Sequence, residues 1–211
     1  MFRKSLLVMM VSGAMVAGVQ AAEVQPNGYL FGNIGQSDAQ KPSIVKEYEA
    51  DVQQAIANGW DVSSSFDDTD TAYKIGAGLQ LNSYVGIEFQ YTDLGEISYK
   101  ENGVGYSYSL KGKTKGYGAN LVGTLPLDQF KLFAKLGHHK LKTKAKEKES
   151  IAGWGVESDN NSETEWVTSF GVGASYAFTR EVELVAEYER YRDVADEYDV
   201  DFASIGLRYN F

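Results

Sequence analysis

The chain contains no cysteine, so it can form no disulfide, no thiolate nucleophile and no cysteine-ligated metal site. It is also short of basic residues, because 20 Lys and Arg stand against 29 Asp and Glu, a net charge of −9. This acidic balance argues against a general nucleic-acid binder, which is usually basic. What the 211 residues do contain is 22 Gly, 14 Tyr and 10 Phe, a composition that favours strands over helices and fits one domain.

Long hydrophobic runs are missing beyond residue 22. Before it, a basic start precedes an apolar stretch from Leu6 to Val19, and Val19-Gln20-Ala21 fits a small-x-small cleavage site. The stretch is diluted by Gly and Ala and is short against the roughly 20 residues of a transmembrane helix. The sequence therefore predicts a secretory signal peptide over residues 1–21 and an exported domain over residues 22–211.

A chain without a long apolar helix can still cross a membrane as a β-barrel, whose strands of about 9–11 residues alternate apolar and polar side chains. The alternation is clearest at the C-terminus, where the odd-numbered residues from Ala203 to Phe211 are apolar and those between them are polar or Gly. The same period recurs at residues 73–81, 85–92, 117–125, 130–137, 170–178 and 182–189. A strand at 28–36 makes eight, with either Leu30 and Ile34 or Tyr29 and Phe31 facing outward.

The connections between these segments alternate in length. Short turns at 82–83, 126–129 and 179–181 alternate with longer polar regions around 38–70, 96–110, 146–163 and 193–200. Outer-membrane barrels have short periplasmic turns and long extracellular loops, and an even strand number puts both chain ends in the periplasm. We therefore expect an all-β fold, an eight-stranded antiparallel transmembrane β-barrel with long extracellular loops. A soluble lipocalin-like barrel would instead be polar outside and apolar inside.

The last strand carries a second pattern at fixed spacing: a polar residue, a glycine and two aromatic positions. These are Ser204, Gly206, Tyr209 and Phe211, and they resemble the C-terminal signal that the outer-membrane assembly machinery recognises. We expect this machinery to be a partner. An amphipathic strand in a soluble sandwich remains the alternative.

Four segments, taken in order, resemble the OmpA transmembrane domain: residues 78–95, 100–103, 134–137 and 186–188. The similarity extends over residues 27–211 and implies a small barrel in the outer membrane of a Gram-negative bacterium. Full-length OmpA proteins also carry a peptidoglycan-binding domain after the barrel. Because this sequence stops at Phe211, we do not expect cell-wall tethering.

The polar face of the strands carries charges of both signs. They are Lys74, Glu88, Lys131, Lys135, Glu183, Glu187, Glu189 and Arg208, with Gln80 and Gln90 beside them. An eight-stranded barrel is just wide enough for its side chains to fill, and opposite charges tolerate burial only as a hydrogen-bonded network. We expect a salt-bridged interior with a plugged or intermittently wet lumen.

Inward acid–base pairs of this kind resemble a gate in the OmpA-like pattern. The resemblance implies gate positions for Glu88, Lys135 and Glu187, whereas Val122 and Ser175 depart from the charged residues of that pattern. Two interpretations follow: charges that only fill the core, and charges that gate a small pore for ions or solutes.

Few residues of the sequence fit a catalytic site. Most outer-membrane barrel enzymes need a His positioned by a Ser or a carboxylate, but His138 and His139 are adjacent and must point to opposite faces of a strand. The acidic residues Asp67, Asp68 and Asp70 have no spacing that links them to a His, and they lack the spacing of a calcium loop. We predict no enzyme, no cofactor and no metal site.

Lysines alternate along two neighbouring segments, on the face that continues the lipid-facing side of each strand. They are Lys111, Lys113 and Lys115, then Lys140, Lys142, Lys144, Lys146 and Lys148. Pairing Leu125 with Phe130 would set Lys115 opposite Lys140, Lys113 opposite Lys142, Lys111 opposite Lys144 and Tyr117 opposite His138. Directly opposed like charges destabilise a strand pair.

Lipopolysaccharide phosphates in the outer leaflet would relieve this repulsion. We therefore predict lipopolysaccharide contact by Lys111, Lys113, Lys115, Lys140, Lys142 and Lys144, with Arg190 and Arg192 extending the basic belt. The alternative is a solvated hairpin whose lysines prevent edge aggregation.

One helix is expected in the first long loop. Ile44, Tyr48, Val52 and Ile56 recur at helical spacing, Ser43 is a candidate N-cap and Gly59 a candidate end. The predicted helix, residues 43–57, either packs over the barrel mouth, with Trp60 and Phe66 sealing the lid, or meets a host cell, another bacterium or a phage.

Together these patterns predict a monomeric outer-membrane protein with a structural or surface-interaction role and recognition by its loops. A small porin-like channel is the alternative.

Overall fold

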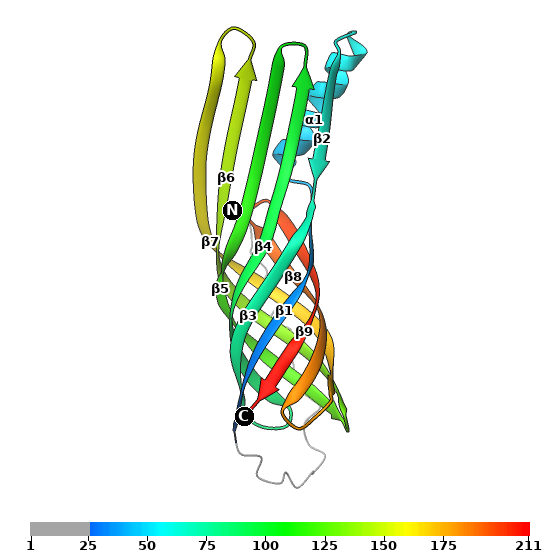
Figure 1. Ribbon diagram of the computed structural model, residues 1–211, viewed down its shortest axis with the longest axis vertical. Helices are drawn as coiled ribbons and strands as arrows, with labels where there is room; N and C mark the ends of the chain where they lie inside the picture. Colours follow the sequence, from blue (N-terminus) through cyan, green and yellow to red (C-terminus); the bar gives the residue numbers. More distant parts are fainter. Residues whose placement is uncertain (1–25) are drawn as a thin grey trace, which may run out of the picture.

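The computed structural model describes residues 26–211, which form nine strands and one helix (Figure 1). The elements are β1 (Asn27–Ala39), α1 (Ser43–Ala57), β2 (Val62–Asp67), β3 (Thr69–Gln80), β4 (Val85–Gly103), β5 (Tyr106–Leu127), β6 (Phe130–Ile151), β7 (Gly155–Ala177), β8 (Val182–Val194) and β9 (Tyr198–Asn210). In this part of the chain, no helix has the length and apolar character of a membrane span. The expected signal peptide, residues 1–21, lies outside the described residues.

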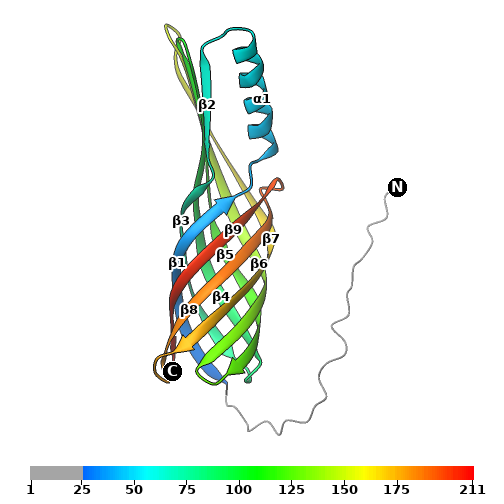
Figure 2. The ribbon, with the colours of Figure 1, turned by 90° about the vertical axis from the view of Figure 1, so that its right-hand side faces the viewer.

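Eight strands close into a tilted ring (Figures 1 and 2). Antiparallel neighbours follow the order β3, β1, β9, β8, β7, β6, β5, β4, and the ring closes because the lower half of β4 pairs with both β3 and β5. The predicted eight-stranded antiparallel barrel is confirmed. A closed ring leaves no strand edge exposed to lipid, where unpaired backbone N–H and C=O groups are costly.

The two ends of the ring differ as expected. At the lower end, where β1 begins and β9 ends, short turns at residues 81–84, 128–129 and 178–181 join the strands. At the upper end, α1 and long hairpins rise well beyond the ring (Figure 2).

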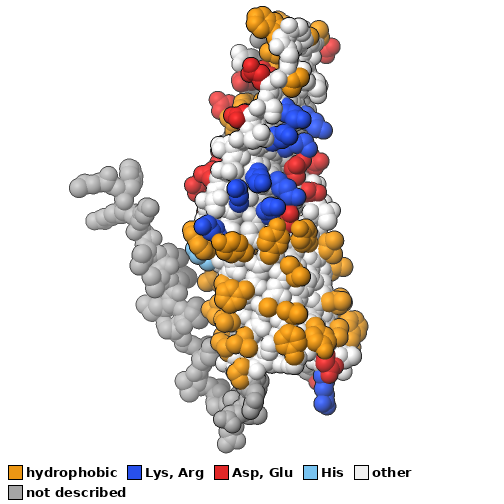
Figure 3. Space-filling model, turned by 60° about the vertical axis from the view of Figure 1, so that its left-hand side comes forward, with side chains coloured by type: hydrophobic (Ala, Val, Ile, Leu, Met, Phe, Trp, Pro, Cys, Tyr) orange, Lys and Arg blue, Asp and Glu red, His pale blue; other side chains and the backbone are white. Residues whose placement is uncertain are grey.

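Side chains alternate between a lipid-facing outside and a polar inside. In β1, Leu30 and Ile34 are exposed on the outside while Tyr29 and Phe31 are buried, which resolves the first strand. Apolar side chains form a belt around the ring (Figure 3).

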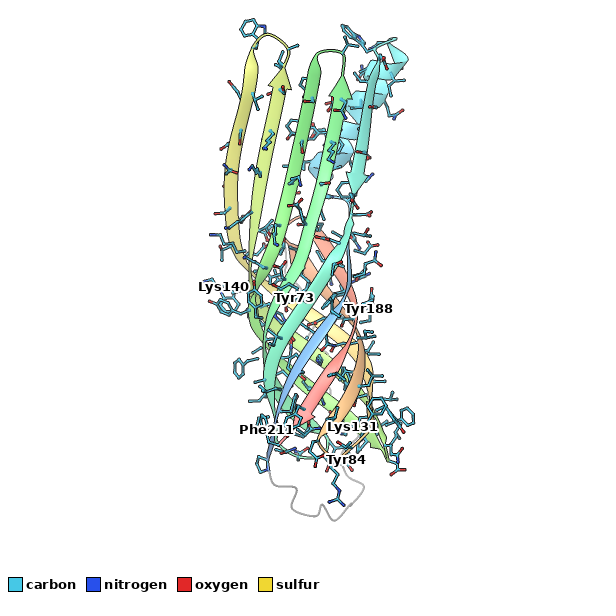
Figure 4. All side chains as sticks on the ribbon, in the orientation of Figure 1. Tyr73, Tyr84, Lys131, Lys140, Tyr188 and Phe211 are labelled. Atoms are coloured by element: carbon cyan, nitrogen blue, oxygen red, sulfur yellow. The ribbon has the colours of Figure 1, made fainter. Side chains whose placement is uncertain are left out.

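Aromatic residues mark both edges of this belt (Figure 4). Tyr73 and Tyr188 lie near its upper edge, and Tyr84 and Phe211 lie at the lower end. Such girdles are typical of transmembrane barrels.

Three of the expected long loops are instead strands. The turn between β4 and β5 is only Val104-Gly105, that between β6 and β7 spans 152–154, and that between β8 and β9 spans 195–197. The prediction of loops around 96–110, 146–163 and 193–200 was wrong. Strands were recognised by one apolar face, and the upper hairpins carry many polar residues on both faces. Apolar alternation therefore stops at the membrane edge while backbone pairing continues.

The first long connection holds both a helix and a strand. α1 has the predicted bounds, with Asn58 as its C-cap followed by Gly59 at φ +85°, but Pro42 and not Ser43 occupies the N-cap position. β2 was not predicted: it pairs only with the upper half of β4, from Val62 opposite Gly103 to Asp67 opposite Ser98.

The helix packs against this upper sheet and not across the barrel mouth. Val45 and Val52 are buried, and the Tyr48 ring lies 5.8 Å from the Tyr99 ring of β4. Phe66 is partly buried beside the helix, whereas Trp60 is 70% exposed, so the predicted sealing role of Trp60 was wrong. 

Glycines inside the ring make room for large inward side chains. A Cβ atom at Gly78 would overlap the ring of Tyr29, whereas a Cβ at the outward Gly123 would come no closer than 4.0 Å to the Ala134 carbonyl oxygen. We expect Gly78→Ala to lower the free energy of unfolding by about 1–3 kcal/mol through overpacking, and Gly123→Ala to change it by less than about 0.5 kcal/mol. Urea titration of both refolded variants measures this, and equal midpoints would contradict it.

Candidate functional site

The buried charges of the ring form one ion network. The ammonium group of Lys74 lies 2.7 Å from Glu187 Oε1 and 2.8 Å from Glu189 Oε2, and that of Lys135 lies 2.8 Å from Glu88 Oε2 and 2.9 Å from Glu187 Oε2. Glu187 is therefore shared by two lysines. All five side chains are nearly inaccessible to solvent, and the ion pairs compensate their charges where water cannot.

Arginine extends this network toward the lower end. The guanidinium group of Arg208 lies 3.3 Å from Glu88 and 3.9 Å from Glu183, and the half-buried Lys131 lies 2.5 Å from Glu183. The eight predicted interior charges thus meet in one connected cluster. The geometry fits a filled core and equally offers alternative partners for Glu88 and Glu187.

A neutral polar cluster lies above the ions, and of its residues the sequence analysis placed only Gln90 on the inward face. His139 Nε2 lies 2.9 Å from Ser169 Oγ, Ser169 donates to Glu189 at 3.0 Å, and Gln90 donates to the hydroxyl of Tyr191 at 3.0 Å. Inward parity on β4, β6 and β7 was the signal that could have found these residues.

The His139 cluster lacks the arrangement of a nucleophilic triad. Both Ser169 and Glu189 approach Nε2, while Nδ1 has no hydrogen-bond partner among residues 26–211, and His139 is fully buried. His138 points outward and stacks on Trp166 at 4.9 Å, as adjacent residues of one strand must.

The lysines lie on the outward face of the upper hairpins, but not in the predicted register. Leu127, not Leu125, pairs with Phe130, because the turn is only Asp128-Gln129 and Asp128 adopts φ +61°. The observed cross-strand pairs are Lys115 with Lys142, Lys113 with Lys144, Lys111 with Lys146, and Tyr117 with Lys140. A shift of two residues preserves the face of every side chain, so the lysines still oppose one another.

Two of the predicted contact residues already have carboxylate partners. Lys111 lies 2.6 Å from Glu96, and Lys113 lies 3.4 Å from Asp93. Arg190 is bound in the same way by Asp201, which corrects its assignment to a free basic belt. The Asp201 carboxylate raises the pKa of the partly exposed Arg190 guanidinium further above its already high usual range.

Six lysines of β5 and β6 have no acidic partner within ion-pair distance in the described part of the chain: Lys115, Lys140, Lys142, Lys144, Lys146 and Lys148. We call this set the lysine face. Figure 3 shows Lys and Arg side chains gathered directly above the apolar belt, and Lys140 lies at the level of Tyr73 in Figure 4. Successive lysines on β6 are about 6.7 Å apart, as alternate residues of a strand are.

Uncharged hydrogen-bonding side chains flank the lysine face on β7. Opposite Lys140 to Lys148 lie Trp166, Thr164, Ser162, Asn160 and Ser158. Lys140 also lies 6.0 Å above the Trp166 ring. A row of cations beside hydroxyl and amide groups can bind phosphate or sulfate groups carried on sugars.

The four residues of the predicted assembly signal lie at the lower half of β9 and just beyond it. Ser204 is buried in the ring, Tyr209 faces outward, and the Tyr209 and Phe211 rings are 5.9 Å apart. Recognition by assembly machinery stays a prediction.

The sequence matches the family described as "Outer membrane protein beta-barrel domain" over residues 5–211. It is 28% identical over 143 residues to outer membrane protein A of Shigella dysenteriae and to that of Escherichia fergusonii. Each alignment covers 64% of this chain and 38% of the relative, so the chain spans well under half the length of these curated relatives.

Solved barrels show the same fold. Ail, the attachment invasion locus protein of Yersinia pestis, superposes with a TM-score of 0.53 at 17% identity, covering 89% of this chain and all of Ail. Neisserial surface protein A superposes with a TM-score of 0.50 at 16% identity, covering 87% of this chain and 97% of that protein.

The ion network predicts a difference between two lysines of β6. Lys135→Met leaves two buried carboxylates each short of a partner, so we expect it to lower the free energy of unfolding by about 3–5 kcal/mol. Lys131→Met, at the partly exposed lower end, should cost about 1 kcal/mol or less. Urea unfolding in detergent measures both, and a similar loss for the two variants would contradict a buried network centred on Lys135.

Proposed function

Because the chain belongs to the family of outer-membrane β-barrel domains, OmpA-like barrels of the Gram-negative outer membrane, we propose that it is a surface-interaction protein whose lysine face binds lipopolysaccharide phosphates. In this proposal the upper end is extracellular. The long hairpins lie at that end, whereas β1 begins and β9 ends at the lower end, which favours this orientation. The observation that carries it is the set of six lysines without acidic partners, directly above the apolar belt.

Position and charge together support this ligand. The lysine face begins beside the aromatic girdle, at the height where headgroup phosphates of the outer leaflet lie. Each exposed lysine near an anionic membrane surface contributes about 1 kcal/mol of attraction. Anionic groups between opposed lysines such as Lys115 and Lys142 would also relieve their mutual repulsion.

The row on β7 supports a ligand that carries sugars as well as phosphates. Thr164, Ser162 and Asn160 offer hydroxyl and amide groups beside the lysines, without an opposing carboxylate on that face of the strand. A free phosphate would use the lysines alone.

A non-catalytic role and a monomer are part of the same proposal. The hydroxyl, imidazole and carboxylate of Ser169, His139 and Glu189 are sealed inside the ring, away from any substrate in solution. Since the ring is closed by its own strands, one chain satisfies its backbone hydrogen bonds in lipid.

Removing two unpaired lysines should weaken lipopolysaccharide binding more than removing two paired ones. We expect Lys142→Gln/Lys144→Gln to weaken the binding of the refolded barrel to lipopolysaccharide by about tenfold or more, since each loses an uncompensated charge. The matched control, Lys111→Gln/Lys113→Gln, removes the same formal charge from cations that Glu96 and Asp93 already neutralise, and should change binding less than about threefold. Titration into nanodiscs of zwitterionic lipid measures both.

Equal losses for the two double variants, or no loss for either, would refute the lysine face as the binding site. Dephosphorylated lipopolysaccharide separates phosphate recognition from sugar recognition. A heparin analogue separates lipopolysaccharide from other polyanions. Yersinia pestis Ail has been crystallised with such an analogue, sucrose octasulfate, and that structure superposes with a TM-score of 0.50 at 16% identity, covering 89% of this chain and all of Ail.

A second candidate function is a small channel, favoured by the shared partners in the ion network. Glu187 contacts both Lys74 and Lys135, and Glu88 contacts both Lys135 and Arg208. A shared carboxylate can exchange one partner for another without becoming unpaired, which is what a gate needs.

Planar-bilayer recording tests the channel. If the network gates a pore, the refolded chain gives brief openings that Glu88→Gln or Lys135→Met makes longer, because a barrier pair is lost. Lys131→Met, at the partly exposed lower end of the network and without contact to Glu88 or Glu187, should leave the open time unchanged. Silence from all folded variants would reject the channel and leave the charges as a core.

A further inference from the structure

The upper sheet has a second face, whose charge is opposite to that of the lysine face. Because side chains alternate along a strand, the residues between the lysines of β6 point the other way, and there β6 and β7 carry acids. Glu147 pairs with Asp159 and Glu149 with Glu157, so like charges again oppose each other directly. In the part of the chain that the structure describes, none of these four has a basic partner within ion-pair distance.

An apolar hollow lies between this acidic face and α1. A cavity of about 210 Å³ is lined by Val45 and Tyr48 of the helix and by Ile97, Leu110 and Ala145 of the sheet. Glu147, Glu163 and Glu197 lie at the same cavity and bring three carboxylates to a lining that also contains the uncharged polar residues Thr143, Asn161 and Ser162. A second hollow, of about 370 Å³, adjoins it through Glu147 and holds the other three acids.

Tyrosine hydroxyls at these hollows are left without partners. Tyr99 lines this cavity and is 1% exposed; Ser64 and Glu101 are the polar neighbours of its hydroxyl, but within residues 26–211 neither makes a hydrogen bond of good geometry to it. The hydroxyl of Tyr108, at the acidic hollow, is buried and unpartnered in the same way. A buried hydroxyl without a partner is costly, so a ligand that supplies one would be favoured.

The edge beside the hollows is also open. β7 pairs with β8 only from Thr168 downward, so above it, within the described residues, one edge of β7 has no neighbouring strand. Along this edge the N–H groups of Asn160 and Ser162 donate to the side chains of Asp159 and Asn161, and an extended chain that pairs with β7 would take over these bonds. Residues 155–164 of this edge are exposed.

From these features we propose that the groove between α1 and the acidic face of the upper sheet binds an extended, cationic, amphiphilic peptide. An apolar side chain fills the cavity, lysine or arginine side chains meet the four opposed acids, and the peptide backbone lies along β7. The acids repel phosphates and lipid A, and a purely apolar ligand would leave them uncompensated. This site is separate from the lysine face and does not rest on it.

The probe is a fluorescein-labelled peptide of about ten residues, enough to follow β7 from the cavity to the acidic pairs. It carries leucines in its first third and lysines alternating with serines in the rest. Binding to the refolded chain is measured by anisotropy in phosphatidylcholine nanodiscs without lipopolysaccharide.

Neutralising the acids should weaken peptide binding by about tenfold or more. The variant is Glu147→Gln/Glu149→Gln/Asp159→Asn, whose side chains lie on the upper hairpin and do not support the ring. A second variant, Ala145→Trp, fills the apolar cavity and should weaken binding while leaving every charge in place.

The charge-matched control removes three exposed acids elsewhere: Glu47→Gln/Asp61→Asn/Asp128→Asn. It should bind the peptide as the parent chain does, and the Lys142→Gln/Lys144→Gln variant should bind it at least as tightly. In turn, the acid variant should keep its affinity for lipopolysaccharide. The peptide site and the lipopolysaccharide site can therefore be refuted separately.

Three results would overturn the proposal. One is binding no tighter than to empty nanodiscs. Another is an equal loss in the acid variant and its matched control. The third is full competition by spermine at the same charge concentration, which would mean a site for small cations and not for a peptide.

Discussion

Backbone hydrogen bonding in lipid is the constraint on which this molecule depends. Within the belt every strand needs a neighbour on both sides, and the pairing of β4 with β5 supplies the last one. Above the belt water can satisfy the backbone, and the sheet opens. The transition is visible in β4, which exchanges β3 for β2 as its neighbour across a bulge between Asp93 and Glu96, where Gly95 adopts φ +80°. The strands β4 to β7 therefore belong both to the ring, which faces lipid, and to the open upper sheet, which faces water.

The same alternation of side chains gives interiors of different chemistry at successive heights along the barrel axis. In the ring, inward positions hold compensated ions such as Lys74 and Glu189, because low accessibility demands partners. Just above, neutral groups around His139 and Tyr191 fill the section. Next comes an apolar cluster that includes Leu141, Val167 and Val200, and higher still the inward positions face the groove and carry acids without basic partners. Outward positions pass from apolar to aromatic to lysine over the same distance. Each level matches the medium it meets.

The sequence predicted which side of the sheet each side chain faces far better than it predicted the strand register or the strand lengths. Alternation along each strand placed Glu88, Lys135 and Arg208 inside, where their side chains are buried. The apolar residues on the lipid side show which alternate positions face outward. Register depends on turn length, and nothing in Pro126–Phe130 distinguishes a two-residue turn from a four-residue one, so every lysine pair was displaced by two. The strands beyond the membrane edge were missed because neither of their faces has the uniform apolar character that signals a strand. That Lys111 and Lys113 are neutralised by β4 follows from the bulge, a tertiary feature, and so lay beyond pattern reasoning.

The continuous pairing of β6 from Phe130 to Ile151 has an evolutionary consequence. A single residue inserted just above the membrane edge would invert the rest of the strand, turning its lysines into the groove and its glutamates toward the lipid headgroups, while the ring below stayed intact. Insertions of two residues would only lengthen the hairpin. In this hairpin an insertion of two residues would therefore keep the lysines and the acids on their faces, whereas an insertion of one residue would exchange them.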